Sequence, residues 1–211
     1  MRKRKLEFAA VSLLVLGRTL PIVLHIPTTK DSSWPPVLRA IGYAVSPIPA
    51  IAAIFYLIYT TEGPEAFGLR KPKLSDLAYI PIAVVIAAGT HYALKSLAST
   101  PASTGTWAES GVAAASLLIL SNVIQTLRDE LFFRAYVNTR LDQFFGIPAV
   151  SCAASAVAYA LASSTGTLAS FGREIGFGLI YVAAFRLSRG VWASGAARLF
   201  LRLQASWRLL G

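Results

Sequence analysis

The sequence predicts an all-α protein, a multi-pass transmembrane helical bundle of six to seven spans. Hydrophobic residues make up 55% of the 211 residues and charged residues only 14%, with a mean hydropathy of +0.58. Soluble domains carry about 25% charged residues. The apolar residues form runs that approach the roughly 20 residues needed to cross a bilayer. Basic residues gather mostly at the ends of these runs. A lipid bilayer is therefore the expected solvent.

Seven apolar segments are expected in chain order. The second contains Pro47-Ile48-Pro49, which is expected to kink or offset the start of its regular helix. The sixth and seventh are shorter than a full span, so we expect a partial or tilted pair. The seventh alternatively lies along the membrane surface as an amphipathic helix. The segments are 6–26, 38–60, 77–97, 111–127, 147–164, 175–187 and 191–203.

The net charge of +10 is attributed to membrane topology. Basic residues are more frequent in every second loop, beginning with residues 2–5 before the first apolar run. The positive-inside rule then predicts an integral membrane protein of the plasma or inner membrane with a cytoplasmic N-terminus. A nucleic-acid partner is not expected, because no basic stripe is interleaved with aromatic residues. No internal repeat or soluble domain is evident, so residues 1–211 are predicted to form a single membrane-embedded domain.

A charged motif, Arg128-Asp129-Glu130-Leu131-Phe132-Phe133-Arg134, follows the fourth apolar run. Ionisable groups at membrane depth are costly and by default indicate a functional site. On a helix, Glu130 and Arg134 are four residues apart and can pair, whereas Asp129 is rotated by about 100° from Glu130. The motif therefore predicts a functional pair of carboxylates. The alternative is an ordinary helix end at the membrane surface.

The motif resembles the first signature of the CPBP family of intramembrane proteases, also called the CAAX-protease or Abi family. That signature is E-E-x-x-x-R, and here it reads Asp129-Glu130-x-x-x-Arg134. Residues 67–73 look like the family's F/L-G-L-R-x-P loop, residues 155–163 like its second signature, S-x-x-x-F-x-x-x-H, and residues 178–192 like the stretch before its third, H-x-x-x-N. The resemblance identifies residues 67–203 as a CPBP-like core. It implies a glutamate-dependent intramembrane endopeptidase that cleaves membrane or prenylated peptides.

The departures from the family pattern fall on its catalytic positions. In the family, the first Glu and the first His are thought to activate a water, and the second His and the Asn to hold the oxyanion. In this chain, those four positions carry Asp129, Ser163, Arg198 and Arg202, respectively. Serine does not titrate near neutral pH as imidazole does. Arg198 either stabilises an oxyanion or pairs with Asp129 or Glu130, and we expect the ion pair because buried charges need compensation.

Three functional hypotheses follow. The first is an impaired or inactive family member, a pseudoenzyme that binds membrane peptides or partner proteins or acts in regulation. The second is an active endopeptidase that uses Asp129 or Glu130 with altered partners. The third is a small transporter or channel-like subunit whose buried charges line a path. No cofactor or metal is expected, because zinc needs three or four ligands and the chain has two scattered histidines and one cysteine.

Overall fold

In the computed structural model, which describes residues 41–42, 44–95, 111–163 and 167–210, every regular element of the described residues is a helix. The all-α class is therefore confirmed for this part of the chain. The first expected segment, 6–26, lies outside the described residues. The elements are α3 (Ile48–Thr61), the short 3₁₀ helix η1 (Pro64–Phe67), α4 (Leu74–Lys95), α5 (Gly111–Asp129), the π-helical segment η3 (Glu130–Asn138), α6 (Thr139–Phe145), α7 (Pro148–Ser163), α8 (Leu168–Ser188) and α9 (Val191–Leu210).

The helix ends follow local sequence signals. Pro47 stands in a turn directly before α3, which confirms the predicted offset at the Pro-Ile-Pro sequence. Thr167 caps α8 by accepting a hydrogen bond from the Ser170 N–H. The prediction of a short sixth segment is wrong, because this cap starts α8 earlier and gives it 21 residues. Helix α9 has 20 residues but is not among the described helices that are apolar enough to cross a membrane. Arg173 and Glu174, which stand just before the expected segment 175–187, pair with each other inside α8.

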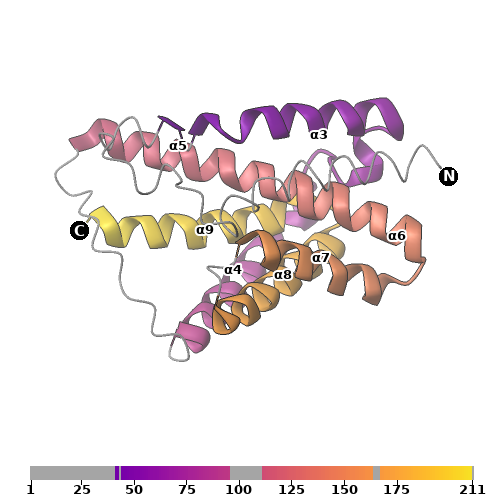
Figure 1. The fold of residues 1–211 in the computed structure, drawn as a ribbon. Helices are drawn as coiled ribbons and strands as arrows, with labels where there is room; N and C mark the ends of the chain where they lie inside the picture. Colours follow the sequence, from indigo (N-terminus) through magenta and orange to yellow (C-terminus); the bar gives the residue numbers. More distant parts are fainter. Residues whose placement is uncertain (1–40, 43, 96–110, 164–166, 211) are drawn as a thin grey trace.

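Helix α9 lies in the middle of the bundle (yellow in Figure 1), where it packs against α4, α5, α8 and η3. Helices α7 and α8 pack closely against each other, and α3 runs beside α5 (Figure 1). Gly178 permits the α7–α8 contact, because a Cβ atom at this position would lie 2.8 Å from the Ala156 Cα. This packing brings side chains from α5, η3, α7, α8 and α9 to one interior region.

Two of the described helices are long and apolar enough to cross a membrane, Leu74–Ala93 and Leu168–Ser188. The shorter apolar helices are Ile48–Thr61 and Pro148–Ser163. In Leu74–Ala93, only 17% of the most apolar 18-residue stretch is buried. Large apolar side chains of this helix, such as Val85, face outward. Outward apolar side chains on a long helix suit a lipid environment. A bundle of six to seven spans goes beyond these helices and stays a prediction.

The loop after η1 docks on the turn between α8 and α9. The Arg70 Nε donates to the Arg189 carbonyl at 3.0 Å, and its Nη2 donates to the Ser188 carbonyl at 2.6 Å and to Asp76 at 2.8 Å. In return, the Trp192 indole N–H donates to the Arg70 carbonyl at 2.8 Å. Two of the stretches that resemble family motifs therefore lie in contact, although more than a hundred residues separate them.

Candidate functional site

The charged motif lies where α5 passes without a break into η3. All nine residues of η3 are buried, and its π-helical turns are of a rare kind that is frequent at functional sites. The predicted pairing of Glu130 with Arg134 is confirmed as an ion pair, with 3.9 Å between Oε1 and Nε. This distance is too long for a hydrogen bond. The alternative of an ordinary helix end at the surface is wrong, because the helix continues and both side chains are buried.

Asp129 is the centre of a buried ion cluster. Its Oδ2 accepts hydrogen bonds from Nη2 of Arg198 and, at 2.9 Å, from Nη2 of Arg202. Its Oδ1 accepts from Nη2 of Arg128 and, at 2.7 Å, from Nε of the same residue. The predicted ion pair between Arg198 and Asp129 is therefore confirmed. Guanidinium groups engage both carboxylate oxygens, which leaves neither of them to position a water.

Glu130 lies beside Asp129 but has different partners. Its Oε2 accepts a hydrogen bond from the Ser194 hydroxyl on α9. Its Oε1 is buried and has no hydrogen-bond partner in the described part of the chain. Gly195 also packs on this side chain, since a Cβ there would lie 3.5 Å from the Glu130 Cγ. Helix α9 therefore fixes one oxygen of Glu130 and leaves the other without a hydrogen bond.

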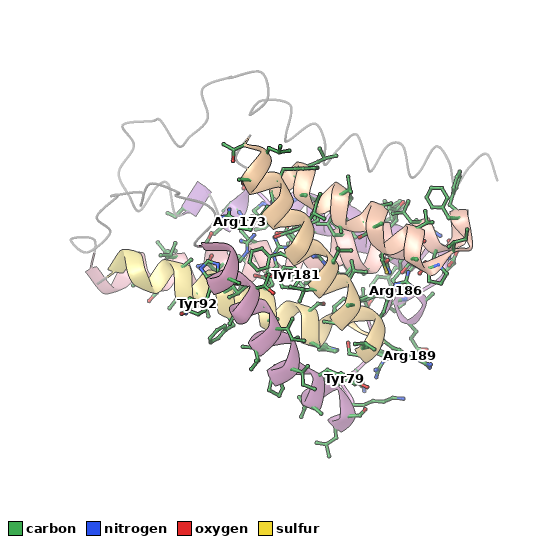
Figure 2. All side chains as sticks on the ribbon, turned by 90° about the horizontal axis from the view of Figure 1, so that it is seen from below. Tyr79, Tyr92, Arg173, Tyr181, Arg186 and Arg189 are labelled. Atoms are coloured by element: carbon green, nitrogen blue, oxygen red, sulfur yellow. The ribbon has the colours of Figure 1, made fainter. Side chains whose placement is uncertain are left out.

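Two tyrosines provide aromatic faces for the buried arginines. The Arg134 Cζ lies 4.6 Å from the ring centre of Tyr159 on α7 and 5.1 Å from that of Tyr181 on α8. The Arg198 Cζ lies 4.5 Å and 5.7 Å from the same two centres. Tyr181 lies among the packed helices, between the two ends of α8 where Arg173 and Arg189 are found (Figure 2). Cation–π contacts of this kind stabilise desolvated guanidinium groups.

Residues 111–203 match the family model Rce1-like, described as type II CAAX prenyl endopeptidase Rce1-like. The segment is Rce1-like. This finding confirms the family that the motifs resemble, whereas no curated protein and no solved structure matches the chain. The match makes residues 111–203 CAAX-protease-like, and a membrane protease family together with two long apolar helices suits a lipid bilayer environment. The loop at residues 67–73 lies before the matched segment.

The Rce1-like segment contains all six residues predicted from the motifs. The structure brings five of them together and places the sixth, Ser163, half-buried at the end of α7, one turn beyond Tyr159. No hydrogen bond between described residues joins Ser163 to the cluster. That the six residues correspond to the family's catalytic positions stays a prediction. The five residues brought together are Asp129, Glu130, Arg134, Arg198 and Arg202.

The sequence reasoning missed several partners in the Rce1-like segment. Ser194 precedes Arg198 by four residues, so helical spacing alone would have placed both on one face of α9. Arg128 was noted only as a neighbour of Asp129, although it supplies two hydrogen bonds. Tyr159 and Tyr181 stand within the quoted motifs, but nothing in the motif pattern indicates their contact with arginine. We find no sequence signal for the π-helical geometry of η3.

The remaining candidates for a functional site are the two histidines and any group of residues that could bind a metal ion. His91 is half-buried on α4, and its ring centre lies 6.3 Å from that of Phe177 on α8. His25 lies outside the described residues. Within the part of the chain that the structure describes, no group of three or more His, Cys, Asp or Glu side chains could hold a metal ion.

Proposed function

We propose that this CAAX-protease-like membrane protein is impaired or inactive as an endopeptidase, and that it acts by binding membrane peptides or partner proteins or in regulation. The ion pair between Arg198 and Asp129 supports the proposal most directly. The family resemblance places a histidine at position 198. That histidine is thought to hold the oxyanion, whereas Arg198 is bound to Asp129. Ser163, at the position of the water-activating histidine, does not titrate near neutral pH as imidazole does.

The expected loss of rate is large. A positioned general base typically contributes about 10²- to 10⁴-fold. A single oxyanion donor contributes roughly 10²- to 10³-fold. Asp129 is occupied by three guanidinium groups, and Ser163 supplies no base. A chain that lacks these contributions retains little of the family's proteolytic rate.

A second candidate function is peptide cleavage that depends on Glu130 alone. It is favoured by the buried Oε1 of Glu130, which has no hydrogen-bond partner among the described residues and so has acceptor capacity for a water. In this reading, Arg198 acts as the fixed cation that stabilises the oxyanion. The two candidates predict opposite results for the natural chain in a cleavage assay.

The test is cleavage of a fluorogenic prenylated peptide and of a membrane-helix peptide by the purified chain in lipid nanodiscs. The natural chain is expected to cleave neither substrate faster than the Asp129→Ala, Glu130→Ala double variant, while it still binds peptide. A matched control is Glu174→Ala, which removes a carboxylate that pairs with Arg173 instead. Cleavage by the natural chain that is abolished by Glu130→Ala but kept in the control would establish the second candidate.

A gain-of-function variant tests the same proposal from the other side. Ser163→His, Arg198→His and Arg202→Asn together place the family's residues at the substituted positions. Cleavage by this triple variant but not by the natural chain would support impairment through these three residues. Solute flux into vesicles that depends on Asp129 and Glu130 would instead favour a transporter or channel-like subunit.

We also infer that the chain resides in the plasma or inner membrane with a cytoplasmic N-terminus. The basic residues at positions 2–5 and in alternate loops support this orientation. Labelling of single cysteines from each side of intact cells tests it, with Cys152 first replaced by Ser. Labelling of a cysteine near the N-terminus from outside the cell would overturn the orientation.

A further inference from the structure

The ion cluster carries more positive than negative charge. Two carboxylates, Asp129 and Glu130, meet four guanidinium groups. The remaining carboxylates of the described residues do not balance this surplus, because Glu65 is exposed and the others pair elsewhere. These pairs are Glu62 with Arg140, Asp76 with Arg70, Asp142 with Arg186, and Glu174 with Arg173. The four fully buried groups, Asp129, Glu130, Arg134 and Arg198, balance in charge, and the surplus of two positive charges comes from the partly exposed Arg128 and Arg202. An anion bound to the cluster would neutralise this surplus.

The hydrogen-bonding groups show the same imbalance. All three nitrogens of Arg134 are buried and have no hydrogen-bond partner in the described part of the chain, and the same holds for Nε and Nη1 of Arg198. The unpaired acceptors in this region are Glu130 Oε1 and Thr126 Oγ1. The five unpaired nitrogens therefore outnumber the two unpaired oxygens. Water can accept hydrogen bonds from such nitrogens, but it carries no charge and cannot neutralise the surplus of positive charge.

The two buried arginines share the same aromatic surroundings. Both guanidinium carbons lie within 6 Å of the ring centres of Tyr159 and Tyr181. Both side chains are buried, and electrostatic attraction is stronger in such surroundings. Arg128 and Arg202 are partly exposed, with 20% and 28% of their side chains accessible. Both bind Asp129, so the ion cluster extends from the buried arginines to the surface of the described structure.

We infer that this cluster is a binding site for a phosphate-type oxyanion, supplied either as free phosphate or as the phosphate of an anionic lipid headgroup. The flat guanidinium fork binds phosphate oxygens in pairs. A carboxylate brings one negative charge and two oxygens, whereas a phosphate monoester brings roughly two charges and three oxygens. Phosphate therefore matches the surplus of two charges and five nitrogens better. The site does not depend on whether the chain cleaves peptides.

The first experiment titrates inorganic phosphate into the purified full-length chain in detergent, with chloride keeping the ionic strength constant. Melting temperature and phosphorus NMR line width report binding. Arg134→Met is expected to weaken binding by roughly tenfold or more, the scale of a lost charge-assisted hydrogen bond. Because this variant also breaks the ion pair with Glu130, its melting temperature is compared with and without phosphate, and the expected result is loss of the phosphate-dependent rise. Arg173→Gln is the matched control and should bind phosphate normally.

A second variant keeps the inference testable if Arg134→Met does not fold. Arg198→Lys keeps a cation for Asp129 but removes the unpaired Nε and Nη1, so it should fold and bind phosphate at least about tenfold more weakly. The lipid source is tested with vesicles of phosphatidylcholine with and without phosphatidic acid, followed by native mass spectrometry. Retention of phosphatidic acid that these variants abolish, without binding of free phosphate, would assign the site to a lipid headgroup.

Three results would overturn the inference. The first is that neither free phosphate nor phosphatidic acid binds the natural chain. The second is that either ligand binds equally well to both arginine variants, which would place it elsewhere. The third is that acetate binds more tightly than phosphate at the same ionic strength, which would contradict the match of charge and oxygen number.

Discussion

The ion cluster predicts that removing its carboxylate destabilises the protein more than removing one of its cations. Asp129→Asn leaves four guanidinium groups, three of them in contact with the substituted side chain, facing only Glu130. Arg198→Met removes one cation, and Asp129 keeps Arg128 and Arg202. The loss of stability is expected to be larger for Asp129→Asn because Asp129 has three guanidinium partners, whereas Arg198 donates to one carboxylate. If each residue had only the other as its partner, the two losses would be similar.

The magnitudes follow from the burial of both groups. Asp129 is 1% exposed and Arg198 is 3% exposed. Breaking a buried pair by removing the partner that compensates it costs about 3–5 kcal/mol of unfolding free energy, which we expect for Asp129→Asn. Arg198→Met should cost about 1–3 kcal/mol, the range for one lost charge-assisted hydrogen bond. The double variant should show a coupling energy of about 1–3 kcal/mol.

The assay is reversible unfolding of the purified chain in mixed micelles, with the four members of the double-mutant cycle measured side by side. A second cycle pairs Asp129→Asn with Arg173→Met, which lies outside the cluster and serves as a control. Those two changes should be additive within about 0.5 kcal/mol. The reasoning is refuted if the Asp129 and Arg198 changes are also additive, or if Arg198→Met is the more damaging of the two.

Three further predictions concern packing and the neighbours of the site. Gly178→Leu should lower stability by about 1–3 kcal/mol, because its side chain would meet the α7 backbone; a smaller loss would show that α7 can move. Arg70→Ala removes three hydrogen bonds to α4 and to the α8–α9 turn, so limited proteolysis should cut the 62–73 loop faster, whereas Arg173→Ala should leave it protected. Ser194→Ala leaves both oxygens of Glu130 without a hydrogen bond and should cost about 1–3 kcal/mol. An unchanged melting temperature for this last variant would contradict the role given to Ser194.

The sequence predicts most helices, because apolar runs and turn residues act locally. Pro47 is sufficient to place the start of α3. The start of α8 is missed because the charged Arg173 and Glu174 stand just before the expected segment 175–187, and their mutual pairing and the Thr167 cap appear only once the chain is folded. Hydropathy alone does not show that α9 lies inside the bundle, where its Arg198 is buried against Asp129.

The candidate site is predictable where a motif fixes a residue and unpredictable where only packing does. The motif alignment predicts that Arg198 meets Asp129, and the structure contains this pair. The alignment also places Ser163 at a catalytic position of the family, but that side chain makes no hydrogen bond to the cluster in the described part of the chain. Tyr181 becomes part of the site only through the packing of α8 against α7 and α9, and no local pattern encodes that contact.

The two arginines of α9 change the electrostatics of the site as well as its acid–base chemistry. With a neutral histidine at position 198 and asparagine at position 202, as in the family pattern, two carboxylates would face two guanidinium groups, those of Arg128 and Arg134. That interior would be balanced, and Asp129 would have fewer cations competing with a water for its oxygens. With arginine at both positions the balance moves to two positive charges, and the same carboxylate is occupied on both oxygens. One pair of substitutions therefore disfavours water activation and favours capture of an anion, so the same side chains lead to both proposals.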